Sequence, residues 1–338
     1  MIRVGVIGLG GMGRKHLACY DHVEGAQVTA VADVVEEKLE PDQEALEINI
    51  GEGAGVVDPE KHELFESGMD LIESADVDLV DICLPTFLHA EHCVAALQAG
   101  RHVLCEKPMA LTADQCAEVL EAAGDAPGRL MIAHVVRFMP PYEYLNETVE
   151  SGRLGRLMEL SVWRGTAPPR WSWENWLLDH ERSGGGMLDL HIHDADFLQY
   201  LLGRPTAVCS TGARGPSGGW DVVETQYFFE DKLAVRAGGN LAMPKGFGFE
   251  ARFGAAFENG CLTFSTREGH GLLEYSEQGV RHPDLSHKDG YVEEIAYFVR
   301  CLENNEMEAM VTPESAAFSV ELVEAERRSV ESGEIVEI

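Results

Sequence analysis

The sequence is short of positive charge. Only seven of its 338 residues are lysine, and the 26 lysines and arginines face 58 aspartates and glutamates, which leaves a formal net charge of −32. A chain this acidic repels nucleic-acid phosphates and anionic lipid surfaces. We therefore expect neither nucleic acid nor a membrane as a partner. The balance suggests a salt-adapted host, and an ordinary acidic cytosolic protein is the alternative.

We also expect neither a leader segment nor paired cysteines. A strand-like pattern follows Met1 directly, without a basic segment or a long apolar run, and this favours a cytoplasmic location. The eight cysteines are scattered, and none forms a Cys-x-x-Cys pair. Several lie in apolar segments, so we expect reduced, buried thiols.

The length and the 45% hydrophobic content suit about two globular domains. In the first 135 residues, short apolar runs alternate with helical segments, which predicts βαβ units around a doubly wound parallel sheet. The strand candidates there are 3–7, 28–32, 79–84, 102–105 and 129–133. Between Val34 and Ala75 the pattern is interrupted, and we expect a broken helix and a longer surface loop. We predict a Rossmann domain over residues 1–125.

The remaining residues, 126–338, have a different texture and predict an α+β domain with an open, mainly antiparallel sheet. Alternating segments separated by turns are typical of antiparallel strands. The strand candidates are 156–164, 207–213, 222–229, 233–240, 247–253 and 261–265, and the helix candidates are 140–150, 187–202, 291–303 and a last helix that begins at Pro313.

A glycine-rich turn follows the first strand. It has the form G-x-G-x-x-G and consists of Gly8, Leu9, Gly10, Gly11, Met12 and Gly13. Such glycines let the backbone approach a pyrophosphate at a helix N-terminus. Asp33 ends the next strand, where a carboxylate can accept hydrogen bonds from ribose hydroxyls and repels a 2′-phosphate. Because Val34 and Val35 offer no cation for such a phosphate, we predict NAD as cofactor, with NADP less favoured.

The stretch His102–Pro108, which ends in Glu106-Lys107-Pro108, resembles the signature of the glucose–fructose oxidoreductase/inositol dehydrogenase (Gfo/Idh/MocA) family. The upstream segment Leu84–His89 resembles that family's second cofactor-contacting loop. The resemblance implies a Rossmann domain, a C-terminal domain on an open sheet, and an active site in the cleft between them. It further implies that Lys107 is catalytic, that its bond to Pro108 is often cis, and that the cofactor is lined by Pro85, Thr86, His89, Glu106 and Lys107.

The segment Gly184–Asp196 carries the second constellation. Asp189, His193 and Asp196 are spaced i, i+4 and i+7, so a helix brings them onto one face. Alcohol oxidation needs a base for the hydroxyl proton, and histidine titrates closest to neutral pH. Asp189 can orient the imidazole, and Lys107 can favour negative charge on the substrate oxygen. The family resemblance implies the same Asp-x-x-x-His dyad, with Asp196 in contact with substrate.

Two other interpretations of this helix stay open. Asp189 and His193 could form an ordinary surface pair. A metal site built from His191, His193 and the aspartates is disfavoured, since two histidines two residues apart point in different directions on a helix. We predict no metal.

Residues that contact the substrate are predicted from the loop at 167–176 and from the family resemblance. Aromatic faces suit the C–H faces of sugars, and arginine suits an anionic group. The candidates are Arg137, Arg164, Trp171, Trp176 and Tyr291. The tryptophans could instead pack under the loop or in a subunit contact. Inositol dehydrogenases carry a His and an Asn flanking the arginine, where this chain has Trp163-Arg164-Gly165, so we expect a different polyol, an amino or acidic sugar, or a glycoside.

Together these patterns predict an NAD-dependent oxidoreductase that transfers a hydride between nicotinamide and a ring hydroxyl or ketone of a sugar, cyclitol or related polyol. A redox-assisted glycosidase or lyase of the same family, and a cofactor-sensing regulator, are the alternatives. An open sheet face usually finds a partner, and members of the family commonly associate. We expect a homodimer or homotetramer.

Overall fold

A computed structural model describes all residues except 42–45, 49–50, 54, 268–270 and 308. The chain forms two compact units. The first comprises Met1–Val135, Trp171–Trp176 and Asp289–Val320, and the second comprises Val136–Arg170, Leu177–Lys288 and Glu321–Ile338. The first unit thus extends about ten residues past the boundary expected at 125/126, and it also includes the later segment Asp289–Val320. No described helix is long and apolar enough to cross a membrane.

The first unit is built on a six-stranded sheet in the order β5-β2-β1-β6-β7-β8. Its strands are β1 (Ile2–Ile7), β2 (Ala26–Ala32), β5 (Glu63–Phe65), β6 (Leu79–Ile82), β7 (His102–Glu106) and β8 (Leu130–Ala133). All neighbouring pairs are parallel. The chain reverses its direction of winding between β1 and β6, and ligands bind at such a point in doubly wound sheets. The predicted fold class is therefore confirmed.

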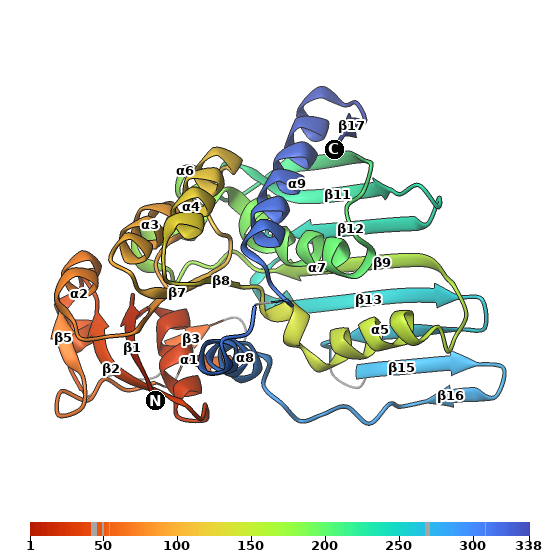
Figure 1. Cartoon of the computed structure of the whole chain (residues 1–338). Helices are drawn as coiled ribbons and strands as arrows, with labels where there is room; N and C mark the ends of the chain where they lie inside the picture. Colours follow the sequence, from red (N-terminus) through yellow and green to blue (C-terminus); the bar gives the residue numbers. More distant parts are fainter. Residues whose placement is uncertain (42–45, 49–50, 54, 268–270, 308) are drawn as a thin grey trace. The chain divides into compact units, whose positions relative to one another are not determined.

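Helices connect these strands (Figure 1). They are α1 (Gly11–Tyr20), α2 (Gly68–Ser74), α3 (His89–Gln98) and α4 (Ala113–Asp125), and the unit also includes α8 (Gly290–Asn304) from the later part of the chain. α1 packs against α8, and α3 packs against α2 and α4. Thr112 is the N-cap of α4, and its hydroxyl accepts a hydrogen bond from the Gln115 backbone N–H at 3.2 Å.

The region between Val34 and Ala75 differs from the expected broken helix. It holds a short 3-10 helix, Glu36–Leu39, then β3 (Leu46–Ile48) and β4 (Gly51–Gly53), which pair with each other, and then β5 and α2. Pro41 cannot continue a helix, which explains the early stop. The strands β3, β4 and β5 have three residues each, which is too short for the polar–apolar alternation by which a strand is recognised in a sequence. Part of the expected loop lies outside the described residues.

The second unit is built on a nine-stranded sheet in the order β16-β15-β14-β13-β9-β12-β11-β10-β17. Its strands are β9 (Leu157–Thr166), β10 (Ala207–Arg214), β11 (Trp220–Phe228), β12 (Ala234–Asn240), β13 (Phe249–Phe257), β14 (Gly260–Ser265), β15 (Gly271–Ser276), β16 (Gly279–Arg281) and β17 (Val336–Glu337). The sheet is antiparallel except where β12 runs parallel to β9. The prediction of an open, mainly antiparallel sheet is confirmed, although it had not included β15–β17.

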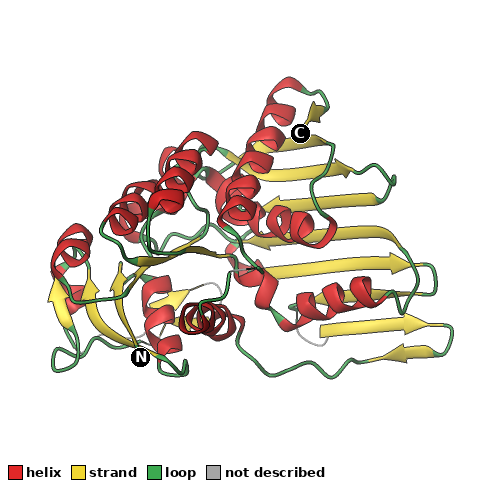
Figure 2. Cartoon of the chain, in the orientation of Figure 1, coloured by secondary structure: helices red, strands yellow, loops and turns green. Residues whose placement is uncertain are grey.

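Within this unit, helices cover one face of the sheet (Figure 2). They include α5 (Pro140–Ser151), α7 (Ile192–Leu202) and the last part of α9 (Pro313–Ser332), while α6 (His180–Ser183) is a single turn. The covered face is aromatic where α5 meets the sheet, since the Tyr142 ring packs edge-on against Phe197 and Phe253.

The opposite face of the sheet carries the alternate, largely polar side chains of the same strands. On β9, for example, Leu160 is buried while Glu159 is exposed. A hollow of about 560 Å³ lies on this face. Arg252 stacks over Trp163 there, with its guanidinium carbon 4.4 Å from the ring centroid.

Candidate active site

The glycine-rich turn of the first unit has the geometry of a phosphate cradle. Gly8 has a φ of +90°, and an added Cβ on Gly13 would lie 1.7 Å from the Gly8 carbonyl oxygen, so both positions require glycine. At Gly10 an added Cβ would meet open space. Among the residues that the structure describes, no side chain caps the N-terminus of α1, and the first turn of α1 holds no acidic residue. Its backbone N–H groups and positive dipole end thus suit a pyrophosphate.

Asp33, at the end of β2, is tied directly to this turn. One carboxylate oxygen accepts the Leu9 backbone N–H at 2.7 Å, and the other accepts the Val35 N–H at 2.9 Å. The Lys38 ammonium lies 3.1 Å from the first oxygen. The sequence analysis considered only Val34 and Val35 and missed Lys38. Lys38 lies five residues after Asp33, and the 3-10 helix Glu36–Leu39 brings its ammonium back to the Asp33 carboxylate.

The loop after β6 holds the next predicted cofactor residues. Pro85 precedes the 3-10 helix Thr86–Leu88, and Thr86 is buried with its hydroxyl lacking a hydrogen-bond partner among the described residues. His89 is also buried, and its ring nitrogens contact the carbonyl oxygens of Pro108 at 2.7 Å and Leu84 at 2.8 Å. Burial lowers the pKa of His89, although both carbonyls oppose this shift. His89 thus joins the two predicted cofactor loops, and its contact with cofactor stays a prediction.

Glu106, Lys107 and Pro108 follow β7 at the carboxyl edge of the sheet. The Lys107–Pro108 peptide bond is cis, as the family resemblance implied. The Glu106 carboxylate is buried and accepts the Lys107 backbone N–H at 3.0 Å. The Lys107 side chain is partly exposed.

In the second unit, the predicted acid–base helix consists of a π-helix, Met187–His191, continued by α7. π-helical turns are rare and are frequent at functional sites. Throughout the fully described stretch 185–199, every residue is buried except Asp189 and His193, which are partly exposed. The predicted pair thus forms the accessible part of an otherwise buried helix.

Asp196, the third predicted member, does not share this exposure. Its carboxylate forms a two-point ion pair with the Arg137 guanidinium, at 2.6 and 2.9 Å, and both side chains are 1% exposed. Two residues earlier, Asp194 binds Arg164 of β9 in the same way, at 3.0 and 3.1 Å. Both predicted substrate arginines therefore hold an aspartate of α7, and their contact with substrate stays a prediction.

His191 points away from the exposed pair. Its Nε2 lies 2.8 Å from the Glu326 carboxylate and 3.3 Å from the Tyr227 hydroxyl, and all three side chains are buried. A metal site that combines His191 with His193 would need the first ring to leave these partners. Burial lowers the pKa of His191, but the Glu326 carboxylate outweighs it and raises the pKa overall.

The turn before the helix is held by a residue that sequence reasoning missed. Gly184 and Gly185 have φ values of +77° and +72°. The buried Asp221 carboxylate accepts the Gly186 N–H at 2.8 Å, and it also accepts the Ser217 N–H at 2.7 Å and the Ser217 hydroxyl at 2.6 Å. No local signal marks Asp221, because it lies 35 residues from Gly186 on β11.

The remaining predicted substrate residues lie in the first unit. Trp171 and Trp173 are 47% and 38% exposed, and Trp176 is partly buried. Tyr291 lies in the first turn of α8, and its ring centroid lies 5.2 Å from the Lys15 ammonium of α1. Lys15 also pairs with Asp289 at 2.6 Å. Large exposed aromatics suit a sugar face, which is consistent with the prediction for Trp171 without testing it.

Comparison with known proteins agrees with this geometry. Residues 2–134 match the oxidoreductase family with an NAD-binding Rossmann fold, and residues 142–263 match the GFO/IDH/MocA C-terminal domain. The chain is 28% identical to a myo-inositol 2-dehydrogenase of Thermotoga maritima, over 100% of this chain and 98% of that protein. It is 26% identical to an inositol 2-dehydrogenase of Rhizobium meliloti, over 97% and 98%. The fold matches a scyllo-inositol dehydrogenase of Lactobacillus casei, solved with NAD(H) and scyllo-inositol, with a TM-score of 0.77 at 20% identity, covering 100% of this chain and 99% of that one.

Proposed function

Because the chain belongs to the GFO/IDH/MocA family of NAD-binding oxidoreductases, we propose that it oxidises a ring hydroxyl of a neutral polyol, with a cyclitol favoured, or reduces the corresponding ketone. The observation that carries this proposal is the partly exposed pair Asp189 and His193 on a helix that is otherwise buried over residues 185–199. Inositol dehydrogenases among the relatives support the cyclitol class.

The proposed chemistry divides between the cofactor and two side chains. Bound NAD would supply the hydride acceptor, and the glycine-rich turn with Asp33 would hold it. The His193 imidazole takes the hydroxyl proton as a general base, and Asp189 orients the ring and stabilises its charged form. The Lys107 ammonium favours negative charge on the substrate oxygen. In the direction of reduction, the same groups return the proton.

The charges around the helix support a neutral substrate. Arg137 and Arg164 are each matched by a buried carboxylate in two-point contact. Such a pair is electrically balanced, and removing one partner would leave a buried charge uncompensated. These two arginines therefore suit a role in holding α7, and they favour a neutral polyol over the acidic sugar that the sequence had also allowed.

A panel of cyclitols, neutral sugars and one uronic acid, each incubated with NAD, tests the proposal through NADH absorbance. We expect stoichiometric NADH formation with at least one neutral ring polyol and none with the uronic acid. Product formation without net NADH would indicate the redox-assisted glycosidase or lyase instead. NAD binding without turnover of any member would favour a regulator.

A further inference from the structure

A buried polar cluster lies behind the glycine-rich turn, in the first unit. Its centre is His16 of α1, which is 0% exposed. The Nδ1 of His16 lies 2.9 and 3.2 Å from the two Asp81 carboxylate oxygens and 3.5 Å from the Cys83 sulfur. Its Nε2 lies 3.2 Å from the Glu106 carboxylate, an ion-pair distance without the alignment of a linear hydrogen bond. One imidazole thus connects the carboxyl ends of β6 and β7.

The arrangement identifies the protonation state of His16. A neutral imidazole carries one N–H, whereas a ring with a carboxylate at each nitrogen needs two. Burial lowers the pKa of His16, but its contacts with Cys83 and Asp81 outweigh burial, and the pKa is raised well above its ordinary value. Burial also raises the pKa of the Cys83 thiol, which stays neutral, so the two carboxylates supply the compensating charge.

Two further groups face this cluster. Glu294 of α8 is 0% exposed, and neither of its carboxylate oxygens has a hydrogen-bond partner among the described residues. Burial, with Glu106 and Asp81 nearby, raises the pKa of Glu294, so it is held in the neutral form. Tyr20 of α1 is also buried, and its pKa is raised by burial. The charged members are therefore His16, Asp81 and Glu106.

His16, Asp81 and Cys83 also present ligand-type atoms within 4.8 Å of one another. Two features favour a proton over a metal ion at this place. The His16–Asp81 contact already has hydrogen-bond length, and the second ring nitrogen faces the Glu106 carboxylate, on the side of the ring away from Asp81.

Glu106 links the cluster to Lys107. Burial raises the pKa of Glu106, but the His16 imidazolium outweighs it, and the pKa is lowered overall. The ionised carboxylate uses its other oxygen to accept the Lys107 N–H at 3.0 Å. The backbone that carries the Lys107 side chain is thus attached to the buried imidazolium through the Glu106 carboxylate.

We propose that His16 is a positioning residue for the Lys107 side chain: its imidazolium holds the Glu106 carboxylate ionised and in place, and Glu106 holds the backbone at Lys107. This inference rests on the proposed action of Lys107 on the substrate oxygen. Neither His16 nor Glu294 needs to touch cofactor or substrate. The contribution belongs to kcat, because Lys107 acts mainly once the hydroxyl is being converted.

His16→Gln tests the proposal in the full-length enzyme with NAD and an accepted polyol. We expect kcat to fall about tenfold, the equivalent of one charge-assisted contact, while the dissociation constant of NAD changes by less than about threefold. Without the cation, burial raises the pKa of Glu106, so its protonation begins at higher pH. The acid limb of the kcat profile should therefore move up by about one pH unit or more. His102→Gln, the same exchange at the other end of β7, is the matched control and should change neither quantity.

A double-mutant cycle with Glu106→Gln separates positioning from general destabilisation. If His16 acts through Glu106, the double variant is no slower than the slower single variant. Additive losses, an unmoved pH profile, or a wild-type kcat in His16→Gln would each overturn the inference. Should His16→Gln fail to fold, nitrogen NMR of the wild-type imidazoles near pH 8 decides, because a neutral His16 ring contradicts the proposal. Full activity in Lys107→Ala would instead refute the proposed function itself.

Discussion

At the scale of single residues, Lys107 and His193 carry the proposed chemistry. We expect Lys107→Ala and His193→Ala each to lower turnover by about 10²-fold or more while NAD binding survives, because both groups act mainly on the reacting hydroxyl. Steady-state rates on an accepted polyol, together with NAD titration, measure this. Asp189→Asn should lower turnover less than His193→Ala does, since an amide can hold the imidazole ring without stabilising its charged form.

Matched substitutions at exposed positions control for these losses. Lys61→Ala and His287→Ala change the same residue types in exposed loops of the chain, and both should keep turnover within about twofold. In His193→Ala, the dependence of turnover on pH should also lack the ionisation near neutral pH. Near-wild-type turnover in either active-site variant would remove these residues from the mechanism.

Cofactor selection depends on the Asp33 carboxylate and its neighbours. We expect Asp33→Ala combined with Val34→Arg to shift the preference toward NADP, because the change removes a charge that repels a 2′-phosphate and adds one that attracts it. Loss of the carboxylate also leaves Lys38 without its Asp33 contact at 3.1 Å. The ratio of kcat/KM for the two cofactors measures the shift. Adding Lys38→Ala to the double variant should reduce the gain, and a wild type that already prefers NADP would contradict the role of Asp33.

At the scale of elements, the helix from Met187 to Leu202 shows how far periodicity reaches. The i, i+4 spacing predicts Asp189 and His193 on one face of the helix, and both residues are partly exposed. It could not show that Asp196 is held by Arg137, 59 residues away, because the periodicity of a helix gives no information about what packs against each face. The π-helical turn likewise has no signature in the residue pattern.

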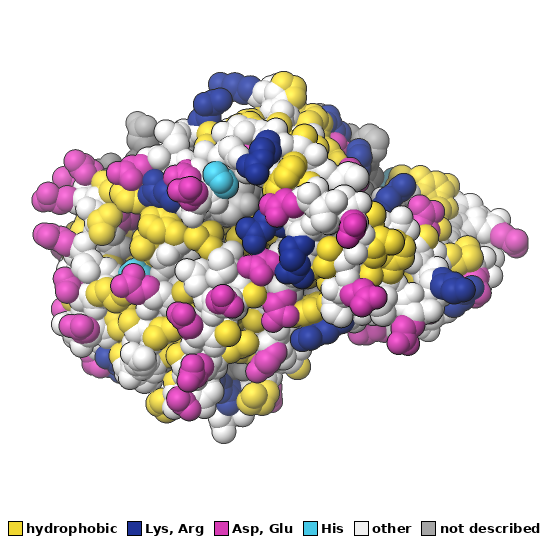
Figure 3. Space-filling view, turned by 90° about the horizontal axis from the view of Figure 1, so that it is seen from above, with side chains coloured by type: hydrophobic (Ala, Val, Ile, Leu, Met, Phe, Trp, Pro, Cys, Tyr) yellow, Lys and Arg dark blue, Asp and Glu magenta, His cyan; other side chains and the backbone are white. Residues whose placement is uncertain are grey.

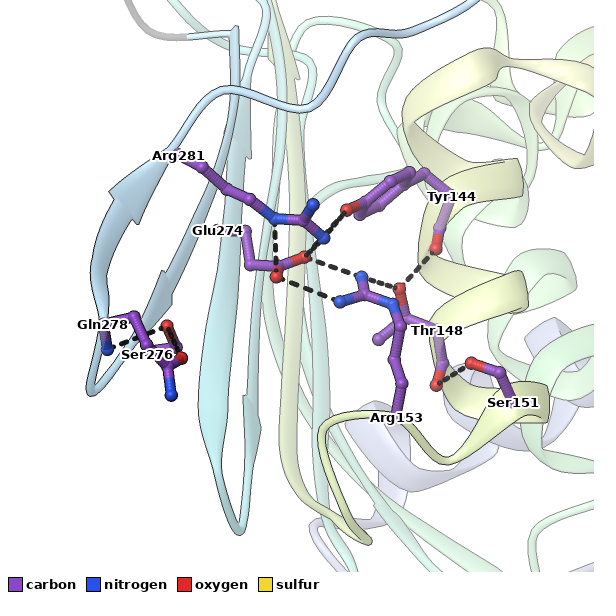
Figure 4. Close-up of polar contacts among 8 residues, drawn as sticks. All are labelled: Tyr144, Thr148, Ser151, Arg153, Glu274, Ser276, Gln278 and Arg281. Carbon is purple, nitrogen blue, oxygen red and sulfur yellow. Dashed lines mark hydrogen bonds and ion pairs between the residues drawn. The ribbon is translucent and has the colours of Figure 1, made fainter.

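The edge of the second sheet depends on one buried carboxylate (Figure 4). Glu274 on β15 accepts hydrogen bonds from Arg153, from Arg281 of β16 and from the Tyr144 hydroxyl of α5, at 2.6 to 3.0 Å. Burial raises the pKa of Glu274, but these donors outweigh it and lower the pKa from 4.5 to about 2. The ionised carboxylate therefore joins α5 to the two edge strands.

This linkage predicts a pH dependence of stability. A depressed pKa stabilises the folded state above its unfolded value of 4.5, and the contribution is lost as the pH falls from there through about 2. We expect Glu274→Gln to lower the free energy of unfolding by about 2 kcal/mol at pH 7, and this difference should shrink as the pH is lowered toward 3. Urea unfolding at several pH values measures it. Glu277→Gln in the neighbouring exposed turn is the control, and a difference that does not change with pH would contradict the assignment.

At the scale of the whole molecule, charge is the dominant feature. Aspartate and glutamate side chains are spread over the face shown in Figure 3, with lysine and arginine in smaller groups. With a net charge of −32, screening should relieve self-repulsion. We expect the melting temperature to rise between low and molar sodium chloride. A flat or falling melting temperature would count against a salt-adapted host and would leave the proposed activity untouched.

Self-association is the second prediction at this scale. The face of the nine-stranded sheet opposite α5 and α7 presents the hollow at Trp163 and Arg252, and an open sheet face of this kind usually finds a partner. We expect a homodimer or homotetramer by size-exclusion chromatography with light scattering. Trp163→Glu should shift the mass toward the monomer, and a wild type that is monomeric at micromolar concentration would refute the prediction.

The sequence by itself determined the features that depend on neighbours along the chain. The glycine-rich turn, Asp33 and the Asp189/His193 pair were predicted from residue types within short segments, and Glu106-Lys107-Pro108 was identified by its resemblance to a family signature. The two sheets followed from apolar runs alternating with helices and from polar–apolar alternation along strands. Such signals are local, and they can therefore be recognised from the sequence alone.

Only the tertiary structure decided which distant side chains meet. Asp81 lies 65 residues from His16, and Asp194 lies 30 residues from Arg164, and no spacing rule connects either pair. These contacts arise because the fold brings the ends of different strands and helices together and buries them, where an isolated charge is costly and a partner is required. The buried carboxylates that the fold places beside His16 therefore favour its charged form, and the aspartates of α7 are held by two arginines in the same way.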